Sequence, residues 1–230
     1  MNSFVLKIIA CITMFIDHIG YVIFDDASFF NYIGRIAFPI FAFQISEGFI
    51  HTRNLKKYLL RLLIFAILSQ IPFMLFLSIF PDDFSLNVIF TLILGLLSVF
   101  IYNKTNILLG ILSTIFLGIS SELLCCDYGF YGVAIVFLFY IFHNNKIALI
   151  LSFIFTTIIN YSSKILEYYS DGLDYIKYAT SYYLPYAICT CLSVLFIALY
   201  NKKKGPNTKY ILYLFYPLHL LLIYIISYFI

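Results

Sequence analysis

Three apolar segments of this chain carry side chains that can hold a charge or exchange a proton. Ionisable groups are costly inside hydrocarbon, so those found there usually face a bundle interior or a wet cavity and often have a function. The polar members of these segments are Asp17, His18, Arg35, Gln44, Glu47, His51 and His219. Their positions predict two polar clusters, one in the outer and one in the inner half of a membrane.

His18 is the strongest candidate for a catalytic group. Histidine titrates near neutral pH, so it can accept and return a proton as a general base. The alternative is a histidine that bridges two helices and has no chemical role. Asp17 points about 100° away from His18 on a helix, so it is expected to pair with another segment, and Arg35 is the candidate. That pair either orders the bundle or belongs to the site.

A second group of polar residues is predicted to lie on one helix face. Gln44, Glu47 and His51 recur at intervals of three and four residues, the spacing that brings side chains together on a helix. They predict a polar seam that runs towards the cytoplasm.

The seam adjoins the basic segment HTRNLKKYLLR. Its cations, Arg53, Lys56 and Lys57, could hold the phosphates of a cytosolic donor, because cationic side chains bind phosphate through charge-assisted hydrogen bonds. The alternative is that they only mark the cytoplasmic side. The run of three lysines at residues 202–204 is interpreted as such a marker.

The elements that position these residues must be membrane helices. The 230 residues are 63% hydrophobic and 11% charged, with a mean hydropathy of +0.99. Soluble domains are about 45–50% apolar and about 25% charged, so this composition excludes soluble enzymes, nucleic-acid binders and disordered chains. The apolar runs are continuous instead of alternating, which excludes a membrane β-barrel. We therefore expect an all-α, polytopic transmembrane bundle.

The apolar runs divide into nine expected spans within a single domain, residues 1–230, with a range of eight to ten spans. Their expected bounds are 4–24, 32–50, 58–79, 86–102, 107–123, 129–142, 147–161, 183–200 and 210–230. The sixth and seventh are short enough to be tilted or to form a re-entrant pair. A long polar connection is expected over residues 161–182.

Charge placement predicts the orientation. With the N-terminus inside, eleven of the fourteen basic residues fall on inner segments, as the positive-inside rule expects. The acidic residues expected outside are Asp25, Asp26, Asp82, Asp83, Glu122, Asp127, Glu167, Asp171 and Asp174. The tyrosines expected to anchor the outer interface are Tyr168, Tyr169, Tyr175, Tyr178, Tyr182, Tyr183 and Tyr186. The N-terminus is therefore predicted to be cytoplasmic.

Common catalytic signatures are missing from the sequence. It has no P-loop, GxGxxG, HExxH or paired CxxC motif, and its four histidines lack metal-ligand spacing. No metal site is predicted.

Longer stretches of the chain resemble the TraX family of polytopic bacterial proteins, named after the F-pilin acetylase. The stretches are LKIIACITMFIDHIGYVIF, YIGRIAFPIFAFQISEGFIHTRNLKKYLLRLLIFAILSQIPF, LNVIFTLILGLL, DYGFYG and YLFYPLHL. Their order and spacing agree from Lys7 to about His219, except over residues 142–200. The family is also distantly similar to the integral-membrane acyltransferase-3 group.

This resemblance implies an acetyl-CoA-dependent acetyltransferase of the bacterial inner membrane, embedded in lipid and without a nucleic-acid partner. The acyltransferase-3 group places an essential histidine on its first span, where this chain has His18. Asp17 and Arg35 would orient that site, and His219 would polarise the thioester or position the acyl arm. The implied acceptor lies outside the cytoplasm and is either the N-terminal amine of a pilin-type protein or a sugar hydroxyl of the envelope.

Two other functions fit the same residues. Intramembrane Asp, Arg, Glu and His also mark the pathways of transporters and ion-coupled carriers, although no internal symmetry supports one here. A non-catalytic assembly factor of the cell envelope is the other alternative.

Overall fold

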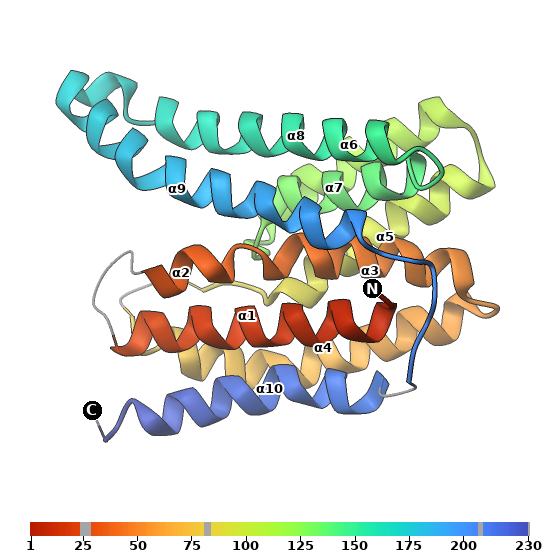
Figure 1. The fold of residues 1–230 in the computed structure, drawn as a ribbon, viewed down its shortest axis with the longest axis horizontal. Coiled ribbons are helices and arrows are strands. Elements are labelled where there is room, and N and C mark those ends of the chain that lie inside the picture. Colours follow the sequence, from red (N-terminus) through yellow and green to blue (C-terminus); the bar gives the residue numbers. More distant parts are fainter. Residues whose placement is uncertain (24–28, 81–83, 207–208, 230) are drawn as a thin grey trace.

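The chain folds as a bundle of helices that run roughly along one long axis (Figure 1). The computed structural model describes residues 1–23, 29–80, 84–206 and 209–229. The helices are α1 (Ser3–Ile23), α2 (Phe29–Gly34), α3 (Ala37–His51), α4 (Leu55–Leu77), α5 (Val88–Lys104), α6 (Ile107–Leu123), α7 (Gly129–Ile141), α8 (Lys146–Leu166), α9 (Leu173–Ala198) and α10 (Lys209–Ile226). The prediction of an all-α membrane bundle is confirmed.

Each of the nine expected spans contains helix, with α2 and α3 together forming the second. Among the described residues, five stretches are long and apolar enough to cross a membrane: α1, α2 with α3, α4, α8 and α9. The apolar helices α5, α6 and α7 are shorter, at 17, 17 and 13 residues.

The second span is a broken helix. Regular helix stops at Gly34 and resumes at Ala37, and two tight turns lie between, in which Arg35 N donates to Tyr32 O and Ile36 N to Ile33 O. Pro39 explains the break, because it has no N–H to donate to the carbonyl four residues earlier, that of Arg35. The break therefore falls at Arg35, within the expected second span.

The expected boundaries around residues 147–200 are wrong. The α8 helix extends over 21 residues to Leu166 instead of ending at 161, and α9 begins at Leu173 instead of 183. The long irregular connection is therefore mostly helix. A hydrogen bond of 3.0 Å joins the hydroxyls of Tyr161, where the connection was expected to begin, and Thr190, so Tyr161 links α8 to α9.

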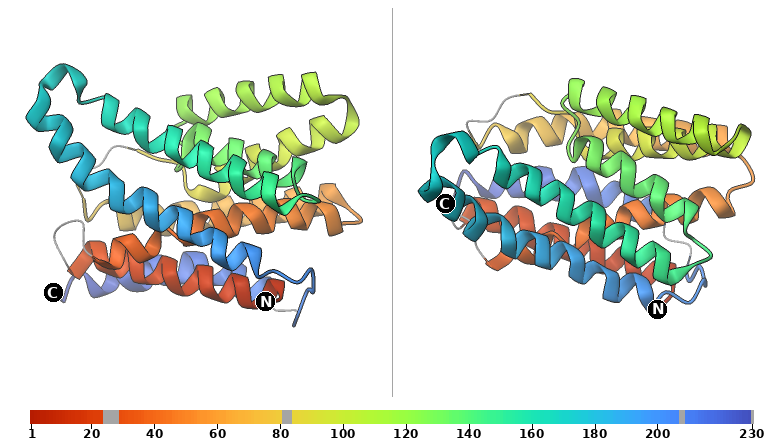
Figure 2. Two further views of the ribbon diagram at one scale, coloured as in Figure 1. Left: turned by 45° about the horizontal axis from the view of Figure 1, so that its top comes forward. Right: turned by 90° about the horizontal axis from the view of Figure 1, so that it is seen from above.

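The start of α5, the end of α6 and the start of α7 lie partway along the bundle (Figures 1 and 2). They do not reach the end of the bundle opposite the basic links. Residues 84–87, which precede α5, have an extended backbone. Leu86 pairs with the α6–α7 loop: Leu86 N donates to Cys125 O, and Asp127 N donates to Leu86 O. The expected start of a span at residue 86 is thus wrong by two residues. Asp127, which was expected on the outer side, is half-buried in this packed loop.

Side chains of α4 and α5 satisfy this buried extended backbone. Gln70 donates to Ser85 O at 2.8 Å and accepts from the backbone and side-chain amides of Asn87. Asn87 also donates to Ala66 O and caps α5 by accepting from Ile89 N. Non-helical backbone at membrane depth persists only where protein satisfies its polar groups, and Gln70 with Asn87 does so here.

The links with basic residues gather at one end of the bundle. The α3–α4, α5–α6, α7–α8 and α9–α10 links all lie at the end that holds the N-terminus, while the C-terminus lies at the other (Figure 1). These links or their edges carry Arg53, Lys104, Lys146 and the lysines at 202–204. The positive-inside rule predicts that this end faces the cytosol. Asp25, Asp26, Asp82 and Asp83, expected outside, lie beyond the described residues.

Candidate functional site

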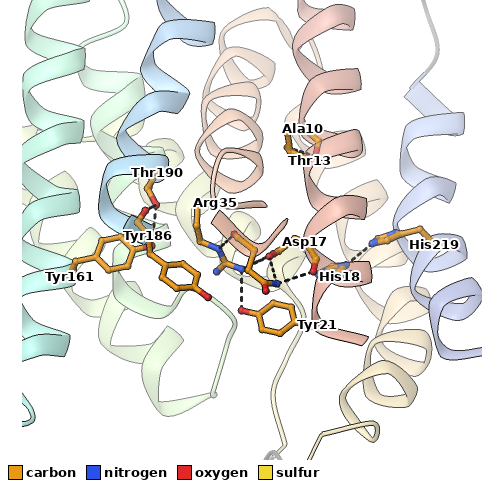
Figure 3. Close-up of polar contacts among 11 residues, drawn as sticks. Ala10, Thr13, Asp17, His18, Tyr21, Arg35, Tyr161, Tyr186, Thr190 and His219 are labelled. Atoms are coloured by element: carbon orange, nitrogen blue, oxygen red, sulfur yellow. Dashed lines mark hydrogen bonds and ion pairs between the residues drawn. The ribbon is translucent and has the colours of Figure 1, made fainter. Parts of the chain in front are cut away.

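Two histidines from opposite ends of the sequence meet between α1 and α10. His18 Nδ1 lies 2.8 Å from His219 Nε2, and the two rings stack at 5.0 Å with an interplanar angle of 6°. His219 Nδ1 lies 2.9 Å from the carbonyl oxygen of Phe215, one turn earlier on α10. Figure 3 shows the pair bridging the two helices.

These contacts assign the protons of the pair. A carbonyl oxygen only accepts hydrogen bonds, so His219 Nδ1 must carry the proton that it donates to Phe215. Neutral His219 then offers Nε2 as an acceptor, and His18 donates to it from Nδ1. The other nitrogen of a neutral His18, Nε2, is left with a lone pair. The geometry therefore presents His18 as a proton acceptor held in one tautomer.

Aromatic rings surround the pair. The ring of Phe76 on α4 lies 4.9 Å from that of His18, and the rings of Phe215 and Tyr216 lie 4.8 and 5.6 Å from that of His219. His219 is buried and His18 is half-buried. Hydrogen bonds between polar groups are stronger in such a shielded setting than in water.

Asp17 points away from His18 and binds Arg35. Arg35 Nη2 lies 2.8 and 2.6 Å from the two carboxylate oxygens of Asp17 (Figure 3). Asn31 donates to the carboxylate and to the backbone carbonyl of Asp17, and its own carbonyl accepts from Arg35 Nε. The expected Asp17–Arg35 ion pair is therefore present, held by a third residue that the sequence did not single out.

Two tyrosines and a glycine complete this cluster. Arg35 Nη2 donates to the Tyr21 hydroxyl at 3.3 Å, and the guanidinium lies 5.2 Å from the centre of the Tyr186 ring. Tyr186 is buried, so it does not anchor the interface as expected of that residue. A Cβ on Gly34 would lie 2.2 Å from Asp17 Cβ, so only glycine allows this approach of α2 to α1.

The predicted polar seam lines a cavity. A cavity of about 620 Å³ lies between α1, α3, α4 and α10, and Gln44, Glu47 and His51 all line it. Glu47 Oε2 lies 3.5 Å from His51 Nε2, and Gln44 Oε1 accepts a hydrogen bond of 2.6 Å from the Ser3 hydroxyl. Arg53 lies at the exposed mouth. The two clusters expected from the sequence are thus both present.

The cations around this cavity differ from those predicted. Lys56 and Lys57 are exposed on the first turn of α4 and do not line it, because the cavity meets α4 at Tyr58, Arg61 and Leu62. The cations that do are Lys7, Arg53, Arg61, Lys202 and Lys204. Two lysines interpreted only as topology markers, Lys202 and Lys204, therefore line the cavity. Their position depends on how the α9–α10 link folds, which no local pattern reveals.

The cavity leads from the basic end of the bundle towards the histidine pair. Its lining includes Met14, one turn before His18, and Tyr216, three residues before His219. Lys7 and His18 are separated by eleven residues of α1, about 16 Å along the axis at 1.5 Å per residue. The arrangement can admit an elongated anionic molecule and bring its far end near an imidazole base. Among the described residues, no three His, Cys, Asp or Glu side chains are grouped to hold a metal ion.

Comparison with known proteins identifies relatives of the whole chain. The model of the family described as TraX protein matches residues 3–227. A probable fimbrial assembly protein, FimC of serogroup H1, from Dichelobacter nodosus is 30% identical and aligns with 96% of this chain and 94% of its own. An uncharacterized protein of Rickettsia prowazekii (strain Madrid E), RP591, is 24% identical over 90% of this chain and 83% of its own. No solved structure matches the chain.

Proposed function

The chain belongs to the TraX family, and we propose that it is a multi-pass acetyltransferase of the bacterial inner membrane. It transfers the acetyl group of cytosolic acetyl-CoA to an acceptor outside the cytoplasm. The association of the TraX family with pilin acetylation and the fimbrial assembly name of the D. nodosus relative support a pilin-type N-terminal amine as acceptor. A sugar hydroxyl of the cell envelope is the other candidate.

The observation that carries this proposal is a histidine pair that lies one turn beyond the deep end of a cationic cavity. A donor that enters from the cytosol with its phosphates at the mouth extends its thioester arm past Gln44 towards Met14 and Tyr216. His18 and His219 lie one turn beyond those two residues. The cavity therefore supplies a path for the donor and the pair supplies the base.

The proposed acetyl transfer needs a base that accepts the proton of the attacking group and a thioester carbonyl carbon that this group attacks. His18 Nε2 takes the proton of the acceptor amine or hydroxyl, whose nitrogen or oxygen attacks the thioester carbon. The carbon–sulfur bond breaks, and the leaving sulfur takes the proton back from His18 as free CoA thiol. In the variant with a covalent intermediate, His18 carries the acetyl group between two such steps.

The Asp17–Arg35 pair orients this base. Asp17 precedes His18 on α1, and its carboxylate is held to α2 by Arg35 and Asn31. A rotation of α1 that moved His18 would therefore break buried charge-assisted hydrogen bonds, which are among the stronger ones in proteins. The acceptor approaches from the end of the bundle that holds this cluster.

Acetyl-CoA turnover by purified protein in nanodiscs tests the proposal. Free thiol release is followed with peptide amines and envelope sugars as acceptors, for wild type, His18→Ala and the control His143→Ala. His143 lies beyond α7, outside the site. We expect release with wild type and with His143→Ala and none with His18→Ala. Normal release by His18→Ala, or no release by any form, would contradict the proposal.

A role in pilus assembly without catalysis is the second candidate, because the D. nodosus relative is described as an assembly protein. It predicts that His18→Ala and His219→Ala both support normal assembly in cells and that a stable protein partner purifies with the chain. Acetylated pilin that depends on His18 would contradict it.

A further inference from the structure

The cavity mouth has a strong excess of positive charge. Among the described lining residues there are five cations, Lys7, Arg53, Arg61, Lys202 and Lys204, and one carboxylate, Glu47. Glu47 already pairs with His51. No carboxylate of the described chain forms an ion pair with any of the five cations. The cavity therefore has the charge to bind a ligand that carries several negative charges.

Lys202 and Lys204 are held in place by the strap, residues 199–206, that links α9 towards α10. The strap pairs with the start of α1: Ser3 N donates to Lys203 O at 2.8 Å and Asn201 N to Met1 O at 2.8 Å. The backbone turns at Lys202, with φ of 60°, and at Gly205, with φ of 75°, where a Cβ would lie 2.9 Å from Phe4 Cβ.

The strap presents alternate lysines to the cavity. Lys202 and Lys204 line it, whereas Lys203 between them does not. A topology marker needs only charge near the membrane surface, not a defined direction. The alternation therefore indicates a binding role for two of the three lysines and provides a matched control in the third.

Lys7 and Arg61 complete the cationic wall from α1 and α4. Lys7 is half-buried and lies within electrostatic range of Lys204 and Arg61. The guanidinium of Arg61 lies over the rings of Tyr58 and Tyr213, at 5.4 and 5.6 Å, and its Nε donates to the Tyr213 hydroxyl. These contacts fix the guanidinium plane, and its terminal amino groups can reach two oxygens of one phosphate.

A second, independent feature of the cavity points to a hydrogen-bond acceptor on the ligand. Gln44 is 7% exposed and lines the cavity on α3. Its Oε1 accepts from Ser3, but its buried Nε2 has no hydrogen-bond partner within the described structure. An unpaired buried amide N–H is costly, so a bound molecule with a carbonyl at this place gains a hydrogen bond that the empty site lacks.

We propose that Lys7, Arg61, Lys202 and Lys204 bind the pyrophosphate of a nucleoside diphosphate, and that Gln44 Nε2 donates to an amide carbonyl in the arm that this nucleotide carries. The identification of that ligand as acetyl-CoA rests on the proposed function. The site replaces Lys56 and Lys57 as phosphate ligands and assigns to Gln44 the recognition of the pantetheine-type arm. Arg53 remains at the mouth.

Binding measurements without turnover test this site. The affinities of CoA and of ADP are measured by calorimetry for the full chain in nanodiscs. The Lys202→Ala/Lys204→Ala variant should bind both ligands about 10- to 100-fold more weakly, the range for losing one or two hydrogen bonds to charged groups. The controls Lys203→Ala and Lys56→Ala/Lys57→Ala should bind both as wild type does. Equal losses in Lys203→Ala and in the double variant, or none in either, would overturn the assignment.

Gln44→Met separates the arm from the nucleotide. It should weaken CoA binding about tenfold, the effect of one lost hydrogen bond, and leave ADP binding unchanged. Loss of both ligands together, or of neither, would contradict the role of Gln44. If CoA binds as described but no acetyl group is transferred, the proposed function fails and the site stands. If turnover depends on His18 while CoA affinity ignores Lys202 and Lys204, the site fails and the function stands.

Discussion

The histidine pair makes a quantitative prediction about His219. His219→Leu removes the acceptor of the 2.8 Å bond from His18 Nδ1. An N–H left without an acceptor in the protein interior costs about 1–3 kcal/mol. At 1.36 kcal/mol per factor of ten, the ratio of the tautomer with a free Nε2 to the other tautomer falls about 5- to 160-fold. We expect kcat for acetyl transfer to fall with the population of that tautomer, by at most this factor. KM for acetyl-CoA should stay unchanged, because His219 does not line the cavity.

A conservative variant distinguishes positioning from chemistry. In His219→Gln the amide Oε1 can take the place of Nε2 as acceptor, so most of the rate should return. The tautomer itself is read by ¹⁵N NMR of protein labelled at histidine, with His18→Ala to assign the signals. Wild type and His219→Gln should carry the His18 proton on Nδ1, and His219→Leu should lose that preference.

Two outcomes would refute this reasoning. A His219→Leu protein with the wild-type rate would show that His18 does not need the hydrogen bond. Equal inactivity of His219→Leu and His219→Gln, with both proteins folded and the His18 tautomer unchanged, would show that the second imidazole takes part in the chemistry itself.

Three further predictions concern the structure that supports the site, each checked by thermal unfolding in detergent. Asp17→Leu leaves the half-buried Arg35 without its carboxylate partner and should lower the free energy of unfolding by about 3–5 kcal/mol, most of it restored in Asp17→Leu/Arg35→Leu. A double variant no more stable than the single one would contradict this. Gly34→Ala should cost about 1–3 kcal/mol, because its Cβ would meet Asp17 at 2.2 Å, and a neutral result would show that α2 can move. Asn87→Ala removes the cap of α5 and the bonds to Ala66 and Gln70, so about 2 kcal/mol or more should be lost, and an unchanged melting temperature would disprove that role.

Continuous apolar runs were enough to predict the class of fold and the existence of each helix, because a membrane helix must satisfy its own backbone and face lipid. They did not predict where α8 and α9 end. Tyr161 was expected to begin a polar connection, yet the partner of its hydroxyl, Thr190, lies 29 residues away in the sequence. The break at Arg35 is local and follows from Pro39, so it could have been predicted from the sequence.

The candidate site could likewise be predicted from the sequence only in part. Helical spacing predicted that Gln44, Glu47 and His51 share a face, and the angle between adjacent residues predicted that Asp17 turns from His18 towards another helix. The contact between His18 and His219 could not be predicted, because 201 residues of sequence separate the two side chains. It also depends on tertiary structure that the cavity is lined by Lys202 and Lys204 and not by Lys56 and Lys57.

Two neighbouring residues of α1, Asp17 and His18, bind elements on different sides of that helix. Asp17 is bound to α2 and His18 to α10, so one turn of α1 is held from both sides (Figure 3). The ion pair lies on the side of the broken second span, and the histidine pair lies beyond the inner end of the cationic cavity. A base fixed between a donor path and a second polar cluster can serve two molecules that enter from opposite ends. The proposed acetyl transfer uses such an arrangement, because its donor and its acceptor reach the base from opposite sides of the membrane.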